Sequence, residues 1–436
     1  MYFFDYLKKL KESGSLTKIK KEVSVDIEAA AVLKAAEPSP IIFKNVQGYP
    51  DFRVAGNIFG TKQSIADYLG ISTAQLIPKL TEAIDKRSPP EVISDAPCQE
   101  VVMGSVDLDT LPILKHNERD GGRYISSAVV VTKDPEYGQN LDFHRAMQFD
   151  KNRMSTRIIK GRDFYKFLER TGEVEAAYCV GNTPNILVAA ATSVKTGINE
   201  LEIANALTKT EVTNAKTVDL LIPAGCEVVL EGRVFMQDRS TEGPFIDLTE
   251  TYDIEREEPV FEVTTITHRK NAIWQALVPG ALEHKVLMGM PREPTIFKSV
   301  NEAEVKCLDV NVNPGGSSWL HAIVKIDKQK EDDGKKAIHA AFAGHRSCKH
   351  VFVVDKDIDI YNPLEVEWAM ATRFQAERDL VDIGKEPGSS LDPSAEPGTK
   401  ITNKMGFDLT APLVTKGKSF ARAEFPKVDL KDYLDE

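Results

Sequence analysis

The chain has 436 residues, of which 42% are hydrophobic and 28% charged, and its formal net charge is −11. This length predicts two or three domains, and a sequence pI near 5.4 argues against a nucleic-acid-binding face. No apolar run approaches the roughly eighteen residues of a membrane span, and the start of the chain lacks the pattern of a signal peptide. Five scattered cysteines, none in Cys-x-x-Cys spacing, favour a reduced, cytoplasmic protein without a disulfide scaffold or zinc site.

The first part of the chain combines helical and strand patterns. Residues 2–13 carry apolar side chains on one helical face. Short apolar strands are predicted at 41–43 and 52–55, and another helix is predicted from about residue 63. An N-terminal α/β domain is therefore expected over residues 1–115.

Strand patterns dominate residues 116–295. The turn-like residues 268–271 predict a hairpin between the last two strands, and a helix near Glu200 interrupts the series. This pattern fits a mostly antiparallel split β-barrel as the central domain. The predicted strands are 125–132, 157–160, 185–191, 217–222, 227–234, 261–267 and 272–277.

Residues 296–436 return to an α/β pattern. A strand at 350–355 is followed by an amphipathic helix at about 364–374. Residues 387–398 are rich in Pro, Gly and Ser, which predicts a linker to a terminal segment. The expected unit is a C-terminal α/β domain that also carries the oligomer contacts.

Two short motifs carry the candidate chemistry. Asn140-Leu-Asp-Phe-His-Arg145 places an amide and a guanidinium five residues apart, and Glu242-Gly-Pro-Phe-Ile-Asp247 places two carboxyl groups five apart. Arginine binds carboxylates bidentately, and a carboxylic acid beside it can deliver a proton. The motifs suit a reaction that binds a carboxylate, releases it and puts hydrogen in its place. Taken singly, each also fits an exposed strand or a plain turn.

The chain resembles the UbiD-type decarboxylases in seven blocks that follow the family's order. These blocks are Gly121–Ile125, Asn140–Arg145, Asn199–Leu201, Ile222–Gly232, Glu242–Asp247, His350–Asp359 and Lys404–Thr410. The resemblance implies removal of CO2 from unsaturated or aromatic acids with prenylated flavin mononucleotide (prenylated FMN), because no side chain can delocalise a carbanion. It also implies the three-domain architecture, a homodimer or hexamer, and a flavin prenyltransferase that supplies the cofactor.

The resemblance also assigns roles to residues of this chain. Arg145 and Glu242 would organise the substrate carboxylate beside the cofactor, and Asp247 would donate the proton that replaces CO2. Asn140 and Glu200 would hold Mn2+ or Mg2+ against the flavin phosphate, with K+ as an optional further ion. The other cofactor contacts would be Phe143, His144, Arg162, Ala190, Ala191 and Thr192, the last three at a strand end, and the substrate pocket would include Phe407 and Leu409.

The chain departs from the family where relatives carry a metal-binding His after the Arg145 strand. This chain has no His between Arg157 and Asp163, and Arg162 lies nearest to that position. A guanidinium can bind phosphate but cannot ligate a metal. Either the ion has one fewer protein ligand or Asp163 substitutes. His144 fits a packing role as well as a ligand role.

The expected substrate rests on similarity to compact archaeal members of the family. It is trans-anhydromevalonate 5-phosphate, which would give isopentenyl phosphate. The alternative is an aromatic acid such as 4-hydroxybenzoate or a polyprenylated derivative. Two other classes remain as rivals, namely a flavin-binding accessory subunit without turnover and an ordinary flavin reductase. The intact Arg145, Glu242 and Asp247 argue against the accessory subunit.

Overall fold

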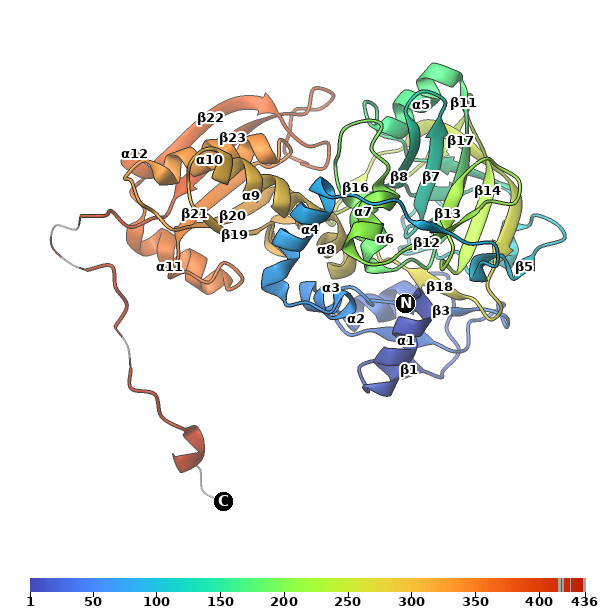
Figure 1. Ribbon diagram of the computed structural model, residues 1–436, viewed down its shortest axis with the longest axis horizontal. Coiled ribbons are helices and arrows are strands. Elements are labelled where there is room, and N and C mark those ends of the chain that lie inside the picture. The colour runs from blue at the N-terminus through green and yellow to red at the C-terminus, as the bar shows by residue number, and fades with distance from the viewer. Residues whose placement is uncertain (415–416, 418, 424, 434–436) are drawn as a thin grey trace.

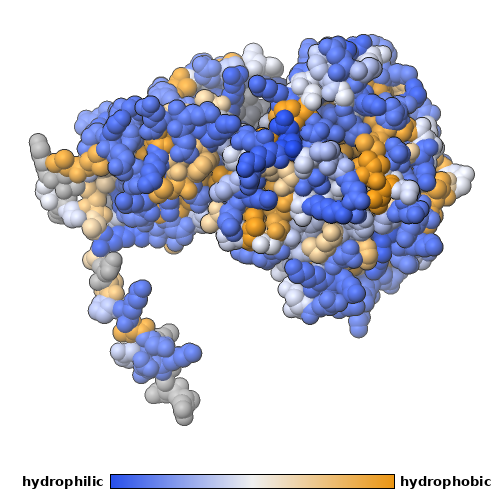
Figure 2. All heavy atoms as spheres, viewed as in Figure 1, coloured by the Kyte–Doolittle hydropathy of each residue, from blue (hydrophilic) through white to orange (hydrophobic). Residues whose placement is uncertain are grey.

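The computed structural model describes residues 1–414, 417, 419–423 and 425–433. Its elements form three regions, and the C-terminal region lies beside the other two (Figure 1). The face drawn in Figure 2 is mostly hydrophilic, with apolar side chains gathered over the central region. No helix among the described residues is long and apolar enough to cross a membrane.

The N-terminal region is a four-stranded sheet with helices, as the sequence predicted. The sheet order is β1-β2-β3-β18. The first helix is followed by Gly14, whose φ of 77° lies in the left-handed region that glycine tolerates. The elements are α1 (Phe3–Glu12), β1 (Thr17–Ile19), α2 (Glu28–Ala35), β2 (Ile41–Phe43), β3 (Arg53–Gly56), α3 (Lys62–Leu69) and α4 (Leu76–Asp85).

The strand β18 (Ile273–Ala276) corrects the predicted hairpin. It pairs in parallel with β3 of the N-terminal region instead of joining residues 261–267. All of its residues are buried, so their pattern identifies a strand but carries no information about its partner. The chain of the central region therefore contributes one strand, β18, to the N-terminal sheet.

The central region is an antiparallel sheet of order β6-β9-β10-β17-β14-β11-β7-β8, with β5 paired to β17. Only His144 and Arg145 join β8, at one edge, to β9, near the other edge. Because this connection is so short, the sheet must curl until its edges approach each other. The strands are β5 (Val101–Val102), β6 (Arg123–Ile125), β7 (Val129–Asp134), β8 (Gly138–Phe143), β9 (Ala146–Gln148), β10 (Arg153–Thr156), β11 (Glu173–Val180), β14 (Val228–Glu242) and β17 (Arg256–His268).

Smaller elements cover this sheet. The helices α6 and α7 pack against β8. Residues 91–92, 211–214 and 221–223 form a separate three-stranded sheet. The elements are α5 (Asp163–Thr171), α6 (Pro184–Ala191), α7 (Glu200–Leu207), β4 (Glu91–Val92), β12 (Glu211–Asn214), β13 (Leu221–Pro223), β15 (Phe245–Ile246), β16 (Tyr252–Asp253), α8 (Leu282–Gly289) and the 3-10 turns Thr73–Gln75, Pro97–Gln99, Leu108–Thr110 and Met290–Arg292.

Three further strand predictions were wrong. Residues 185–191 form the helix α6, which Pro184 starts from a position where its missing N–H costs nothing. Every residue of α6 is buried, and an apolar run without alternation does not distinguish a helix from a strand. Residues 157–160 follow the end of β10, and of 217–222 only the last two residues belong to a strand.

The C-terminal region is a five-stranded sheet of order β19-β20-β21-β23-β22. The predicted strand at 350–355 and helix at 364–374 are confirmed. The elements are α9 (Glu293–Glu302), β19 (Cys307–Asn311), β20 (His321–Ile326), α10 (Asp333–Gly344), β21 (His350–Asp355), α11 (Pro363–Arg373), α12 (Ala376–Asp379), β22 (Leu380–Pro387), β23 (Ile401–Asp408) and the 3-10 turns Pro314–Gly316 and Leu430–Tyr433.

The Pro/Gly/Ser stretch is not a linker to a separate segment. Residues 388–400 connect β22 to β23, which pair with each other in one sheet. Composition predicted the lack of regular structure but not that the chain returns to the same sheet.

The buried side chains divide the molecule differently from its sheets. Two hydrophobic clusters each combine N-terminal and central residues, such as Phe59 with Val129 and Leu33 with Phe261. A further cluster combines the C-terminal sheet and its helices α9 and α10 with Ile77 of α4. The first two regions therefore share an interior, and the C-terminal region largely has its own.

Candidate active site

One cavity brings most of the predicted site residues together. It has a volume of about 730 Å³ and is lined by residues of the central sheet, of the helices α6 to α8 and of the C-terminal region. Cavities of this size hold cofactors and small ligands. The predicted residues that line it are Asn140, Phe143, His144, Arg145, Arg162, Ala190, Ala191, Thr192, Glu200 and Asp247.

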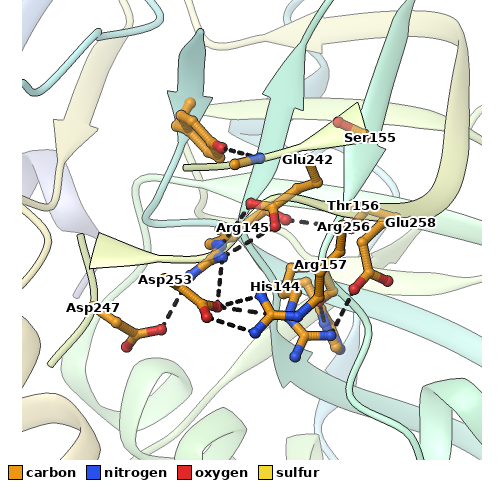
Figure 3. Close-up of polar contacts among 12 residues, drawn as sticks. His144, Arg145, Ser155, Thr156, Arg157, Glu242, Asp247, Asp253, Arg256 and Glu258 are labelled. Carbon is orange, nitrogen blue, oxygen red and sulfur yellow. Dashed lines mark hydrogen bonds and ion pairs between the residues drawn. The ribbon is translucent and has the colours of Figure 1, made fainter. Parts of the chain in front are cut away.

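Arg145 is the centre of the polar network at this cavity (Figure 3). Its Nε and Nη2 donate hydrogen bonds to the two carboxylate oxygens of Glu242 at 2.8 and 3.0 Å, and its Nη1 donates to Oδ2 of Asp247 at 3.0 Å. Burial lowers the pKa of Arg145, but the surrounding carboxylates outweigh burial and raise it. The structure thus joins the three predicted catalytic residues around one charged guanidinium.

A third carboxylate at Arg145 was missed from the sequence. Asp253, in β16, accepts a hydrogen bond from Nη2 of Arg145 at 3.1 Å, and Arg256 donates to both of its oxygens at 2.6 and 2.7 Å. Burial alone would raise the pKa of Asp253, but these partners lower it below its ordinary value. Four of the five N–H groups of Arg145 are therefore engaged.

A glycine-rich segment supports the turn that follows Glu242. A Cβ on Gly121 would lie 2.1 Å from the carbonyl oxygen of Gly243, so only glycine permits this approach. The backbone N–H of Gly243 donates to the hydroxyl of Tyr124 at 3.0 Å. This packing explains how the block around residue 121 contributes to the site without lining the cavity.

The two predicted metal ligands lie close together on β8 and α7. Oε2 of Glu200 accepts a hydrogen bond from the backbone N–H of Leu141 at 2.8 Å, and Nδ2 of Asn140 has no hydrogen-bond partner. Burial raises the pKa of Glu200 well above its ordinary value. The buried carboxylate of Glu200 and the amide oxygen of Asn140 are oxygen donors that fit a hard divalent ion, whereas the unpartnered Nδ2 of Asn140 cannot ligate a cation. No group of three or more His, Cys, Asp and Glu residues in the described part of the chain has metal-site geometry.

His144 makes one ring hydrogen bond and one ion-pair contact that lacks hydrogen-bond geometry. Its Nδ1 lies 2.8 Å from the carbonyl oxygen of Arg157, and its Nε2 lies 2.9 Å from Oδ1 of Asp142. Its ring meets Phe164 edge-on at 4.9 Å between centroids. These contacts favour the packing role over the ligand role.

The segment in which relatives carry a His ends at Arg162, and Asp163 begins the helix α5. Nη1 of Arg162 donates to the hydroxyl of Ser193 at 3.1 Å. Oδ1 of Asp163 accepts from Nζ of Lys166 at 2.8 Å and from the hydroxyl of Thr196 at 2.7 Å. Because Asp163 is already held by a lysine, this arrangement favours one fewer protein ligand over substitution by Asp163.

Two residues after the central sheet, half-buried His284 and buried Arg292, also line the cavity and were missed. Nδ1 of His284, in α8, accepts a hydrogen bond from the backbone N–H of Gly280 at 3.0 Å. Burial lowers the pKa of His284, so the ring is neutral and carries its proton on Nε2. The second residue is Arg292. His284 belongs to α8 and Arg292 to the 3-10 turn after it, and neither lies in a motif that marked it as a site residue.

The C-terminal region contributes a different surface from the one predicted. Residues 388–391 and Lys400 line the cavity, whereas Phe407 and Leu409 do not. Phe407 stacks on Phe352 at 4.9 Å between centroids, and both predicted residues belong to the cluster beneath α11. Residues two apart on a strand share a face, and this face of β23 points away from the cavity.

Family models match almost the whole chain. The models describe the N-terminal, Rift-related and C-terminal domains of 3-octaprenyl-4-hydroxybenzoate carboxy-lyase (UbiD), and they match residues 7–84, 91–282 and 285–409. The chain belongs to the UbiD family. Anhydromevalonate phosphate decarboxylase from Methanosarcina mazei is 38% identical to this UbiD-family chain, over 98% of this chain and 100% of its own length.

Solved UbiD-class structures share the fold. HmfF from Pelotomaculum thermopropionicum, in complex with FMN, superposes with a TM-score of 0.95 at 34% identity and covers 100% of both chains. An evolved dimeric form of HmfF, in complex with prFMN, gives a TM-score of 0.91 at 32% identity, with 99% of this chain and 100% of that chain covered. The three-region architecture of this chain is therefore that of UbiD-class enzymes.

Proposed function

We propose that the protein is a prenylated-FMN-dependent decarboxylase that converts trans-anhydromevalonate 5-phosphate to isopentenyl phosphate and CO2. The observation that carries the proposal is Arg145, held by Glu242, Asp247 and Asp253 in the wall of the cavity. The Methanosarcina mazei relative supports the substrate, and the HmfF complexes support the cofactor.

Arg145 would bind the carboxylate that is lost. Nε and both N–H groups of Nη2 are engaged by Glu242 and Asp253, so only Nη1 is left for the substrate, and one of its two N–H groups is occupied by Asp247. Glu242 is buried and accepts two hydrogen bonds from Arg145, and Asp253 is also held by Arg256. Asp247 accepts one hydrogen bond from Arg145 and one from the backbone N–H of Leu248, and it lies in the cavity wall. An incoming carboxylate would therefore take the Nη1 atom of Arg145 from Asp247.

This exchange would also prepare the proton donor. Asp247, once separated from Arg145, loses a neighbouring cation and gains a neighbouring substrate anion, and both changes favour its protonated form. It would then donate this proton to the carbon that has lost CO2. Glu242 and Asp253 would keep Arg145 oriented throughout.

The cofactor would be held by the other end of the cavity wall. Asn140 and Glu200 would bind a divalent ion, Mn2+ or Mg2+, that meets the flavin phosphate, with Arg162 beside it. The buried Glu200 carboxylate, whose pKa burial raises, supports this assignment. Ala190, Ala191 and Thr192 line the same cavity, but they end the helix α6, so their backbone presents carbonyl oxygens rather than N–H groups. When bound, prenylated FMN supplies the electron sink that cleavage of the carbon–carbon bond requires.

The proposal includes the wider organisation of the protein. The curled antiparallel sheet would be the split barrel that holds the flavin. A flavin prenyltransferase would supply the cofactor, and the protein would act in the cytoplasm as a homodimer or hexamer.

The decisive experiment is a turnover assay of protein produced together with a flavin prenyltransferase. The mass and absorption of the extracted cofactor first establish whether the flavin is prenylated, because ordinary FMN would point to a flavin reductase. The loaded protein should release CO2 from trans-anhydromevalonate 5-phosphate and form isopentenyl phosphate. Turnover of 4-hydroxybenzoate instead would support the aromatic alternative, and turnover of neither acid would support an accessory subunit.

A further inference from the structure

Arg292 is a buried cation that contacts no carboxylate of the residues that the structure describes. Its side chain lines the cavity, and the residue is 9% exposed. Its Nη1 donates to the hydroxyl of Ser193, its Nη2 donates to the carbonyl oxygen of Ala191 at 2.6 Å, and its Nε has no partner. Burial and the charge of Arg162 lower the pKa of Arg292 to about 9. Buried charges are normally paired, so this cation calls for an anion that binds from the cavity.

A second guanidinium faces the same hydroxyl. Arg162 donates to Ser193 at 3.1 Å, so two arginines converge on one oxygen. Their field reaches His345, where burial first and then the charges of Arg292, Lys404 and Arg162 lower the pKa to about 3. His345 is therefore neutral and adds no charge. The result is positive charge at the junction of the central and C-terminal regions without a compensating carboxylate.

The surroundings of Arg292 fix its plane. Its guanidinium lies 5.1 Å from the centre of the Trp319 ring, and Nε1 of Trp319 donates to the hydroxyl of Ser389 at 3.0 Å. Trp319, Ser193 and Ser389 all line the cavity. An oriented guanidinium with hydroxyls beside it matches the oxygens of a phosphate group.

The cavity is thus polarised between two arginine sites. Arg145 lies among three carboxylates, so its surroundings are negative overall, whereas the surroundings of Arg292 are positive. A dianion is repelled from the first site and attracted to the second. We infer that Arg292, Arg162 and Ser193 form a subsite for a phosphate monoester. The choice between the two phosphate-bearing ligands, the flavin and the acid substrate, rests on the proposed function.

The test compares ligands with and without the phosphate. Arg292→Met removes the charge and keeps much of the side-chain length. If the subsite takes the flavin phosphate, the variant should bind FMN roughly 10- to 100-fold more weakly by fluorescence quenching, whereas riboflavin, which lacks the phosphate, should bind equally well. If it takes the phosphate of the acid, FMN affinity should be unchanged. In loaded enzyme the KM for the phosphorylated acid should then rise by that factor, and kcat/KM for its dephosphorylated analogue should not fall.

Two further variants complete the experiment. Arg292→Lys keeps the positive charge but not the planar guanidinium, so it should lose less affinity for the phosphate than Arg292→Met. It also tests the subsite if Arg292→Met does not fold. Arg373→Met is the matched control, because Arg373 is equally buried but pairs with Asp355 and Asp357 away from the cavity. It should leave every affinity unchanged. Parental affinity of both Arg292 variants for FMN and for the phosphorylated acid would overturn the inference. A protein that shows the phosphate effect but releases no CO2 would keep the subsite and refute the proposed function.

Discussion

Asp247 is the one carboxylate at Arg145 that can leave without breaking the network. Glu242 is fully buried and makes two bonds to the guanidinium, and Asp253 is also held by Arg256, whereas Asp247 makes one bond to it. Asp247→Asn should therefore preserve the fold and flavin binding. A positioned general acid contributes a factor of about 10²–10⁴, so turnover should fall by that much.

Exchange in D2O separates this role of Asp247 from a purely structural one. The parent protein should place deuterium at the carbon that loses CO2, and Asp247→Asn should label the product no faster than it turns over. Parental rates of decarboxylation and exchange in the variant would mean that another group delivers the proton.

Two buried arginines should respond to the same substitution in opposite ways. Arg373 makes ion pairs with Asp355 and Asp357, so Arg373→Met leaves buried negative charge behind and should cost up to about 3–5 kcal/mol of folding free energy. Asp357 is half exposed, which places the expected cost at the lower end. Arg292→Met removes an unpaired charge and should leave the apo protein as stable as the parent or more stable. Urea denaturation of both apo variants measures the difference, and equal losses would contradict an unpaired Arg292.

The sequence located residues that lie in motifs and missed residues brought in by packing. Arg145, Glu242 and Asp247 could be chosen because their types and spacing match a known chemistry. Asp253 joins them only because β15 and β16 pair. His284 and Arg292 reach the cavity because α8 and the turn after it pack beside α6, a contact between segments about a hundred positions apart.

The contact between Gly121 and the turn at Gly243 requires a residue without a Cβ at position 121, which can be tested. A Cβ on Gly121 would meet backbone atoms of Gly243, which cannot move aside as a flexible side chain could. Gly121→Ala should therefore cost about 1–3 kcal/mol and displace Glu242 from Arg145. Gly104→Ala is the matched control, because nothing lies within 4 Å of its added Cβ and its φ is not positive. Its effect should stay within about 0.5 kcal/mol. Equal melting temperatures of the two variants would refute the proposed support of the turn.

The errors in secondary structure have a common physical origin. Both α6 and β18 are buried along their whole length. Complete burial removes the alternation of apolar and polar residues that distinguishes a strand from a helix, and an all-apolar strand does not indicate which strand it pairs with. The amphipathic helices α1 and α11, by contrast, were predicted within a residue or two. Hydrophobic periodicity therefore predicted the elements that have one solvent-exposed face and failed for the elements that tertiary contacts cover completely.

At the scale of the whole molecule, the cavity lies between the central region and the C-terminal region. Its central wall belongs to the interior shared with the N-terminal region. Its other wall includes residues 388–391 and Lys400, the two ends of the connection between β22 and β23. A ligand that touches both walls should hold the connection in place. Bound flavin should then reduce the opening of residues 388–400, which are distant in sequence from the motifs predicted to contact the flavin.

Limited proteolysis measures this coupling at Lys400, which is exposed and lies in the cavity-lining connection. Trypsin cleaves the transiently opened segment, so its rate follows the open population when closing is fast. If flavin binds only when the connection is closed, FMN at a hundred times its Kd should slow this cleavage by up to about 100-fold. Cleavage at Lys330, which is exposed and does not line the cavity, should be unaffected. Equal protection at both sites would indicate global stabilisation, and no protection at Lys400 would mean that the connection does not cover the flavin.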